Sequence, residues 1–304
     1  MPQLIIGVHA GKKSLVLPSA KPRKTLTAAI DEDLSVYGLN AVQIFTHGPR
    51  NNNRNKFEAK NIEKVCSDVD LSVHGSYLLP GVWKYKFAKD DSKLTDAEQK
   101  KNNQIIGIMK SHLKACEEVG AWGLVLHVTK QPPKHVAAVV RVFKPLARKF
   151  GIKIVLEMVA SKADAKTYET PKKINYVSKL IGKGSWWGWC VDTAHLWGAG
   201  VDIQSYDNMK QWLSELDDPD KIVMFHLNGS ENARGSGKDK HWPCLAPGDK
   251  IWEDIDPEKS GVKAVIEFCV KRDLTMICEI KRGSKKIITE SINTIKEIGR
   301  RYEV

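Results

Sequence analysis

The chain has 304 residues, of which 42% are hydrophobic and 28% are charged. These proportions are ordinary for a globular protein with a hydrophobic core, and they exclude a largely disordered chain. The 48 Lys and Arg residues exceed the 36 Asp and Glu residues by 12. This excess favours a polyanionic partner such as nucleic acid about as much as it favours a generally basic surface.

The cysteine pattern and the N-terminal residues predict an intracellular protein. The six cysteines include no Cys-x-x-Cys pair, so neither a zinc ribbon nor a disulfide framework is indicated, and a reducing compartment fits best. The apolar run from Leu4 to Val8 is too short for the core of a signal peptide. No apolar run approaches the length of a membrane span, and we expect no membrane partner.

Apolar runs with strand character recur along the chain and are separated by segments of helical length. Strands are predicted over residues 4–9, 41–46, 71–74, 123–128, 152–158, 186–192, 221–227 and 274–280. Helices are predicted over 96–119, where Thr95 and Glu98 form a capping box, and over 207–216 and 264–271. Eight alternations without a linker predict a single (β/α)8 TIM barrel domain over residues 1–304.

The long connections of this barrel all follow strand C-termini, at residues 48–55, 80–95, 161–170 and 229–252. Loops of this length inside a compact domain are usually functional. Their basic and aromatic side chains suit phosphates and exposed bases, although for any single residue a solvated rim, with Trp83 packed inward, is the simpler interpretation. These side chains are Arg50, Arg54, Trp83, Lys84, Tyr85, Lys86, Arg234 and Lys238.

Potential metal ligands follow the apolar runs where the strands end. The strand-end residues are His74, His127, Glu157, Asp192, His226 and Glu279, and the loops after two of these ends add His195, Asp239 and His241. A single histidine at a strand end is weak evidence, but six consecutive strands that all end in a potential ligand are not easily explained by structural roles alone. Active sites of TIM barrels lie at this end, and His, Asp and Glu without Cys are typical ligands of catalytic zinc.

Glu157 lies between earlier ligands on strands three and four and later ligands on strands six to eight, so it is the natural carboxylate to bridge two metal ions. We expect Glu157 and Glu279 to be catalytic as well as metal-binding. Of the other histidines, His9 at the end of the first strand could support a ligand. By contrast, His47, His112 and His135 are expected to be surface or packing residues.

The motifs around these ligands resemble those of the endonuclease IV family of apurinic/apyrimidinic (AP) endonucleases. The resemblance covers nearly the whole chain and is strongest to the branch found in large cytoplasmic DNA viruses. The matching segments are Val73-His74-Gly75-Ser76-Tyr77-Leu78, Leu126-His127, Leu156-Glu157, Val191-Asp192-Thr193-Ala194-His195, Phe225-His226-Leu227-Asn228, Lys238-Asp239-Lys240-His241 and Cys278-Glu279.

The resemblance implies a barrel with three zinc ions that cleaves the phosphodiester 5′ of an abasic site in duplex DNA and leaves a 3′-hydroxyl and a 5′-deoxyribose phosphate. It assigns zinc one to His74, His127 and Glu157, zinc two to Glu157, Asp192, His226 and Glu279, and zinc three to His195, Asp239 and His241. By motif position, Arg50, Tyr77 and Leu78 would contact the DNA and help to flip out the abasic nucleotide.

The chain departs from the bacterial pattern of that family in loops. Leu245-Ala246-Pro247-Gly248 replaces a Gly-Glu-Gly turn, Met158 replaces Asn, and Val128-Thr129 replaces Pro-Gly. No ligand is lost, so these departures bear on loop shape and substrate range. If the protein is viral, we expect a monomer that acts in the host cytoplasm or nucleus, and the virion is a further location that fits.

Two other classes of protein are compatible with parts of the pattern. A sugar isomerase or epimerase on a related barrel would use Glu157, Asp192, His226 and Glu279 around one divalent ion, and would leave the other five ligands without a role. A zinc-stapled DNA-binding module without activity is disfavoured because structural zinc generally takes thiolates.

Overall fold

The barrel is closed in the computed structural model, which describes residues 3–11, 24–88, 93–164, 166–280 and 284–303. Within these residues, eight parallel strands pair in the order β1-β10-β7-β6-β5-β4-β3-β2, and β2 closes the ring on β1. They are β1 (Ile5–His9), β2 (Ala41–Ile44), β3 (Asp70–His74), β4 (Gly123–Val128), β5 (Lys153–Met158), β6 (Trp187–Asp192), β7 (Ile222–His226) and β10 (Thr275–Cys278). The predicted TIM barrel is confirmed.

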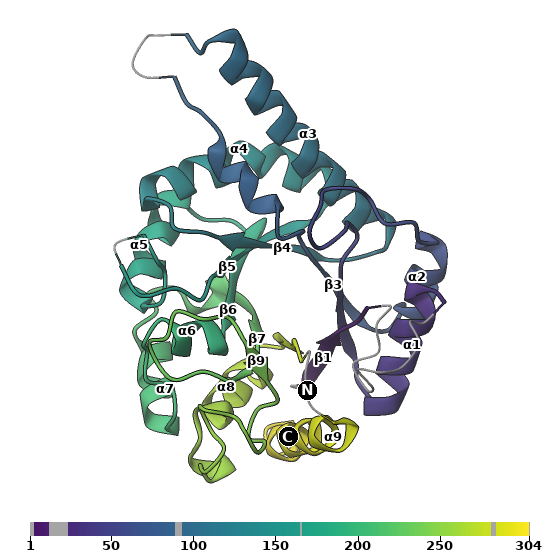
Figure 1. The fold of residues 1–304 in the computed structure, drawn as a ribbon, viewed down its shortest axis with the longest axis vertical. Helices are drawn as coiled ribbons and strands as arrows, with labels where there is room; N and C mark the ends of the chain where they lie inside the picture. The colour runs from purple at the N-terminus through teal and green to yellow at the C-terminus, as the bar shows by residue number, and fades with distance from the viewer. Residues whose placement is uncertain (1–2, 12–23, 89–92, 165, 281–283, 304) are drawn as a thin grey trace.

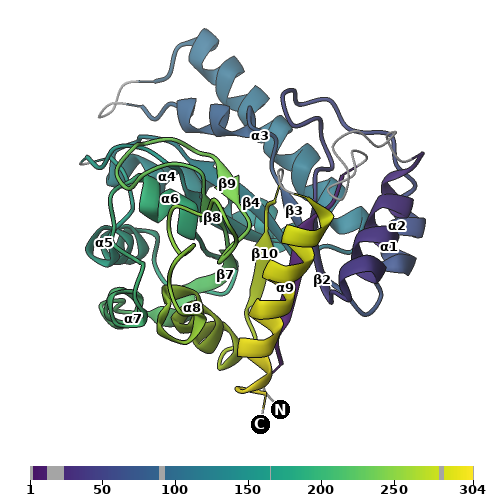
Figure 2. The ribbon, with the colours of Figure 1, turned by 60° about the horizontal axis from the view of Figure 1, so that its bottom comes forward.

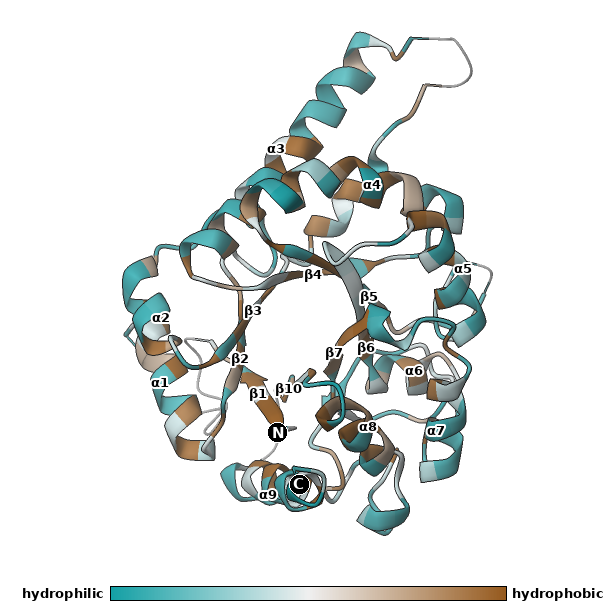
Figure 3. Cartoon of the chain, turned by 180° about the vertical axis from the view of Figure 1, so that it is seen from behind, coloured by the Kyte–Doolittle hydropathy of each residue, from teal (hydrophilic) through white to brown (hydrophobic). Residues whose placement is uncertain are grey.

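Helices surround this barrel, and their apolar sides face the strands while hydrophilic residues line the outside (Figure 1, Figure 3). The α-helices are α1 (Leu26–Tyr37), α2 (Ala59–Val65), α3 (Asp96–Glu118), α4 (Pro133–Phe150), α5 (Pro171–Ile181), α6 (Thr193–Gly198), α7 (Tyr206–Ser214), α8 (Gly261–Val270) and α9 (Lys285–Arg300). Short 3₁₀ helices are η1 (Leu79–Lys84), η2 (Pro219–Lys221) and η3 (Pro257–Lys259), and β8 (Gly229–Ser230) pairs with β9 (His241–Trp242).

Helix α3 begins where the sequence predicts. Thr95 accepts a hydrogen bond from the backbone N–H of Glu98, and the Glu98 carboxylate accepts one from the N–H of Thr95, so the capping box is present. The first turns of α3 project beyond the barrel (Figure 1). The amide of Asn102 ties them to the preceding segment, because it accepts from the N–H of Lys86 at 2.9 Å and donates to the carbonyl of Lys86 at 2.7 Å.

The inside of the barrel is filled by one apolar layer, and this layer positions the polar residues above it. The layer consists of Ala41, Val125, Val155, Cys190, Met224 and Ile277, all fully buried. Side chains on a strand alternate between its two faces, so the residue two positions further on also points into the barrel. Those residues are Gln43, His127, Glu157, Asp192, His226 and Glu279.

Tryptophan and cysteine side chains contribute to the buried core. Trp187 and Trp189 are fully buried, and all six cysteines are free and buried in a core of apolar side chains. Among the described residues, no helix is both long enough and apolar enough to cross a membrane.

His47 and His112 are packing residues rather than surface residues. Their rings stack with centroids 3.7 Å apart, and the side chains are 1% and 0% exposed. Burial, then the charges of His112 and Arg54, lower the pKa of His47 to about 3, and burial lowers the pKa of His112 to about 4. Both rings therefore stay neutral in the folded protein at pH values where an unfolded chain would protonate them.

We expect this pair to make the folded protein less stable in acid. Each pKa is lower in the folded chain than its ordinary value of 6.5, so the free energy of unfolding falls as pH decreases from about 6.5 to about 4. The slope is at most about 1.4 kcal/mol per pH unit for each histidine. Urea unfolding of the wild type and of His112→Gln at pH 7 and pH 5 measures this loss of stability. An equal loss in both proteins between the two pH values would contradict the prediction.

Candidate metal centre

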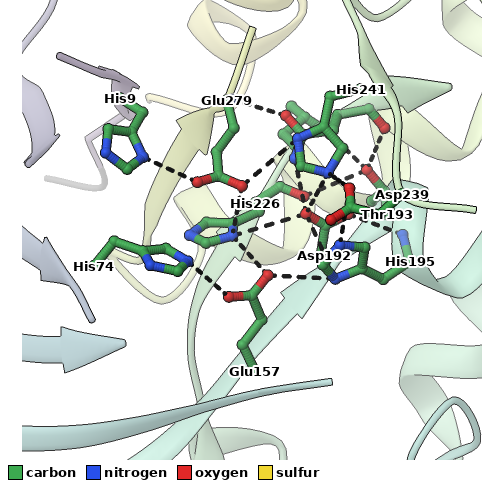
Figure 4. Close-up of polar contacts among 12 residues, drawn as sticks. His9, His74, Glu157, Asp192, Thr193, His195, His226, Asp239, His241 and Glu279 are labelled. Atoms are coloured by element: carbon green, nitrogen blue, oxygen red, sulfur yellow. Dashed lines mark hydrogen bonds and ion pairs between the residues drawn. The ribbon is translucent and has the colours of Figure 1, made fainter. Parts of the chain in front are cut away.

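The candidate ligands come together at the C-terminal mouth of the barrel, where Figure 4 labels all of them except His127, which also contacts Glu157. Glu157 on β5 is fully buried at the centre of this cluster. Its Oε2 atom lies 3.0 Å from Nε2 of His127 and 3.4 Å from Nε2 of His74. The neighbouring strands β3 and β4 present these two rings, because His127 pairs with Glu157 in the ladder. One carboxylate oxygen thus faces one pair of imidazoles.

The second oxygen of the same carboxylate faces the opposite side of the barrel. Oε1 of Glu157 lies 3.1 Å from Nδ1 of His226, and that nitrogen is 3.3 Å from Oε2 of Glu279 and 3.7 Å from Oδ2 of Asp192. Glu157 therefore shares its two oxygens between two groups of potential ligands. This is the arrangement that a carboxylate bridging two ions requires.

The third group is built around His195 on α6 and His241 on β9. Oδ1 of Asp239 lies 2.9 Å from Nε2 of His241 and 3.4 Å from Nε2 of His195. Asp192 also borders this group, since its Oδ2 is 3.5 Å from Nε2 of His241. The structure thus places Asp192 between the second and third groups, in addition to the side chains that the resemblance assigns there.

The charges of these residues stabilise one another. Burial opposes ionisation of Glu157, but the charges of His127 and His226 outweigh it and hold the pKa of this carboxyl well below its usual value. Burial likewise opposes protonation of His195, whereas Asp192 and Asp239 raise its pKa well above the ordinary value. The carboxylate of Glu157 is therefore ionised near neutral pH, as a metal ligand must be.

The chemistry of the donor atoms fits metal ions. Several buried donor atoms have no hydrogen-bond partner within the described residues, namely Oε2 of Glu157, Nε2 of His195, and Nδ1 and Nε2 of His241. Buried polar atoms are rarely left unpaired. Their separations of 2.9 to 3.6 Å resemble those of atoms that share an ion, since two ligands of a tetrahedral zinc with bonds of roughly 2 Å lie about 3.3 Å apart.

The histidine rings are oriented for coordination by hydrogen bonds on their far sides. Nδ1 of His74 donates to the carbonyl of Gly75 at 2.7 Å, and Nδ1 of His195 donates to the carbonyl of Met158 at 2.7 Å. A carbonyl only accepts, so each bond leaves the lone pair on Nε2 and points it toward the neighbouring carboxylates. Because the carbonyl of Met158 is a backbone group, it can orient His195 whichever side chain stands at position 158.

Asn228 and Trp83 support the ligands in roles that the sequence did not predict. Asn228 donates to Oδ2 of Asp192 at 2.8 Å and accepts from the N–H of Glu279 at 2.8 Å, so one amide links two ligands. The indole of Trp83 donates to the carbonyl of His127 at 2.9 Å. The sequence signals for Asn228 were its position just beyond a strand end and its place in the matching segment Phe225-His226-Leu227-Asn228. His9 does contact Glu279, with Nδ1 3.0 Å from Oε1, as its strand-end position suggests.

The β8–β9 hairpin carries His241 over the barrel (Figure 2). The buried carboxylate of Asp249 anchors it by accepting hydrogen bonds from the N–H groups of Ser230, Ile251 and Leu245 at 2.9 to 3.0 Å. Leu245 has a φ of 61°, a left-handed backbone conformation that favours glycine.

The three candidate DNA-binding residues lie next to one another at the rim. The N–H of Tyr77 donates to the carbonyl of Pro49 at 2.8 Å, which holds the loop that carries Arg50 against the start of the next one. Leu78 is 52% exposed and Tyr77 is 37% exposed, both high for large apolar side chains. The Tyr77 ring lies 5.7 Å from the His74 ring, so the exposed group adjoins the metal ligands.

Comparison with known proteins identifies the family of this chain. The xylose isomerase-like TIM barrel family matches residues 32–297. The Probable AP endonuclease of African swine fever virus (isolate Tick/Malawi/Lil 20-1/1983) is 30% identical over 278 residues, which are 86% of each chain. The chain belongs to the AP endonucleases of this family. The resemblance expected from the motifs is confirmed, and the protein is an enzyme of a group of metal-dependent hydrolases.

Further relatives agree with this membership in the AP endonucleases. The Probable endonuclease 4 of Mycoplasmopsis pulmonis (strain UAB CTIP) is 28% identical over 220 residues, 67% of this chain and 73% of the relative. The crystal structure of AsfvAP:AG has a TM-score of 0.78 at 24% identity and covers 97% of this chain and 98% of that chain. A D-tagatose 3-epimerase-like protein reaches a TM-score of 0.62 at 16% identity, covering 98% of each chain, so these structural likenesses show the fold alone.

Proposed function

We propose that the protein is a DNA repair endonuclease with three zinc ions, which hydrolyses the phosphodiester 5′ of abasic sites in duplex DNA during base excision repair. The products would be a 3′-hydroxyl and a 5′-deoxyribose phosphate. The observation that carries the proposal is the position of Glu157, whose two oxygens face separate groups of ligands, with a third group above the same mouth. Curated relatives named AP endonuclease and endonuclease 4 support the choice of substrate.

In this proposal, separate groups of residues would hold the three ions and contact the DNA. His74, His127 and Glu157 would hold the first ion, Glu157, Asp192, His226 and Glu279 the second, and His195, Asp239 and His241 the third. When bound, the ions supply positive charge to a phosphodiester and activate water at neutral pH. Glu157 and Glu279 are buried, and their pKa values lie well below the usual value, so both would offer ionised carboxylates at fixed positions to the ions. Tyr77 and Leu78 present apolar surface beside the mouth, where it can fill the space left by a flipped-out nucleotide.

Incision of a duplex that contains a tetrahydrofuran abasic analogue tests the proposal. We expect one cut 5′ of the analogue, none in the undamaged duplex, and none in the presence of a chelator. Metal analysis of the purified protein is expected to give about three zinc ions per chain. An intact abasic duplex would refute the nuclease, and a single manganese or magnesium ion with turnover of a ketose would instead establish the sugar epimerase. We also propose a monomer that works in a reducing compartment.

Removal of the Arg50 side chain is expected to weaken DNA binding and leave the fold intact. Arg50 is exposed at the tip of its loop, so Arg50→Ala should not change the stability of the protein. If Arg50 contacts a phosphate, the logarithmic slope of affinity against salt concentration should decrease by about 1. Fluorescence anisotropy on an abasic duplex measures both effects. Arg148→Ala, which removes an exposed arginine at the end of α4, is the matched control, and equal effects of the two substitutions would refute the role of Arg50.

A further inference from the structure

Gln43 is a buried polar residue next to the metal ligands that no part of the proposed function uses. It lies on β2, two residues beyond Ala41 of the apolar layer inside the barrel, and its side chain is 0% exposed. Its Nε2 atom lies 3.0 Å from Nε2 of His226 and 3.4 Å from the hydroxyl of Ser72. Its Oε1 atom has no hydrogen-bond partner within the described residues. The amide therefore contacts the far side of a ligand ring.

His226 uses its two ring nitrogens for different purposes. Nδ1 faces the carboxylates of Glu157 and Glu279 at 3.1 and 3.3 Å, whereas Nε2 faces Gln43. A neutral imidazole carries one proton, and the nitrogen that binds an ion is the one without it. Coordination through Nδ1 therefore requires the proton on Nε2, and the group opposite Nε2 must accept it.

The other ligand histidines with a hydrogen bond on the far side show how this is usually arranged. His74 and His195 donate to the backbone carbonyls of Gly75 and Met158, which can only accept. His226 differs because its far nitrogen meets a side-chain amide, which donates through its nitrogen and accepts through its oxygen. The orientation of this one amide thus decides which nitrogen of His226 carries the proton and which keeps a lone pair for an ion.

We propose that Gln43 is a positioning residue that prepares His226 for the metal ion. With the amide turned so that Oε1 faces the ring, Gln43 accepts the hydrogen bond from Nε2–H, and the lone pair on Nδ1 points at the second group of ligands. With the nitrogen toward the ring, Nδ1 holds the proton and cannot bind an ion. The inference rests on the metal centre of the proposed function, but it does not depend on the DNA substrate.

Two substitutions separate an accepting role from mere packing. Gln43→Glu keeps an acceptor of similar size, whereas Gln43→Met fills the space without one. Far-side partners of ligand histidines typically contribute about 10- to 100-fold to metal affinity. We expect Gln43→Met to weaken the affected zinc site by that factor and Gln43→Glu to remain within a few-fold of the wild type. Competition with a chromophoric chelator measures the affinity without any assay of activity.

Ser72→Ala is the matched control, because it removes the other partner of the same amide and leaves the contact with His226. It should change zinc affinity little. A Gln43→Met protein with wild-type affinity, or a Gln43→Glu protein weaker than Gln43→Met, would overturn the inference. If both Gln43 variants fail to fold, ¹⁵N spectra of the zinc-loaded wild type decide, since His226 must then carry its proton on Nε2. Zinc binding without incision of abasic DNA would refute the substrate and leave this inference intact.

Discussion

Glu157→Gln is expected to reduce incision of an abasic duplex by at least three orders of magnitude in kcat/KM, which corresponds to about 4 kcal/mol of lost transition-state stabilisation. The reason is that each carboxylate oxygen serves a different group of imidazoles, so one substitution affects two ions. An amide keeps one oxygen, but its NH₂ group cannot bind a cation. We expect the variant to retain fewer zinc ions per chain than the wild type.

Glu169→Gln provides the control for loss of a buried carboxylate. Glu169 is 5% exposed and pairs with Lys173 at 2.6 Å, away from the ligand groups. The Glu169→Gln protein should keep the zinc content and the incision rate of the wild type, even if its stability decreases. A Glu157→Gln protein that holds the full set of zinc ions and cuts at the wild-type rate would show that Glu157 does not bridge two ions.

Removal of metal is expected to lower the stability of the fold as well as to stop incision. An ion present at 100 times its dissociation constant stabilises the folded state by about 2.7 kcal/mol, so three independent ions contribute about 8 kcal/mol. The corresponding decrease in Tm is on the order of 15 °C. Without the ions, the mouth contains buried carboxylates and imidazoles whose donor atoms lack hydrogen-bond partners among the described residues.

Thermal unfolding before and after chelation, followed by addition of one metal at a time, measures this effect. We expect zinc to restore the Tm in steps that saturate near three equivalents, whereas magnesium should restore little, since it prefers oxygen ligands. The same Tm with and without chelator would show that the three groups of side chains do not hold ions in the folded protein. Saturation at one equivalent would favour the epimerase.

The boundaries of the barrel strands were predictable because each strand is a short, largely apolar run. The predicted strand over 123–128 matches β4 (Gly123–Val128), and the others differ by at most two residues at an end. Because strand side chains alternate, Glu157 faces the same way as Val155, and the structure shows that this is the inside of the barrel. What the sequence could not give is the partner of each side chain across the ring.

Register between β6 and β7 illustrates that limit. Trp189 pairs with Ile222 but Cys190 pairs with Met224, so Val223 is an extra residue in β7. This bulge brings Asp192 opposite His226, and without it the neighbour of Asp192 would be Phe225. The two apolar runs contain no sequence signal for the extra residue. Both faces of these strands are apolar, so a shift of one position leaves the hydrophobic pattern unchanged.

The sequence by itself determined that the chain forms a TIM barrel and that acids and imidazoles collect at one end of it, because strand periodicity and strand ends are local properties. Only the tertiary structure decided that the two oxygens of Glu157 serve different groups, that Asp192 lies between two of them, and that Gln43 and Asn228 contact ligands. The separations along the chain run from 36 positions, for Asp192 and Asn228, to 183 positions, for Gln43 and His226. Closure of the ring brings them together, and no local pattern encodes which side chains then meet.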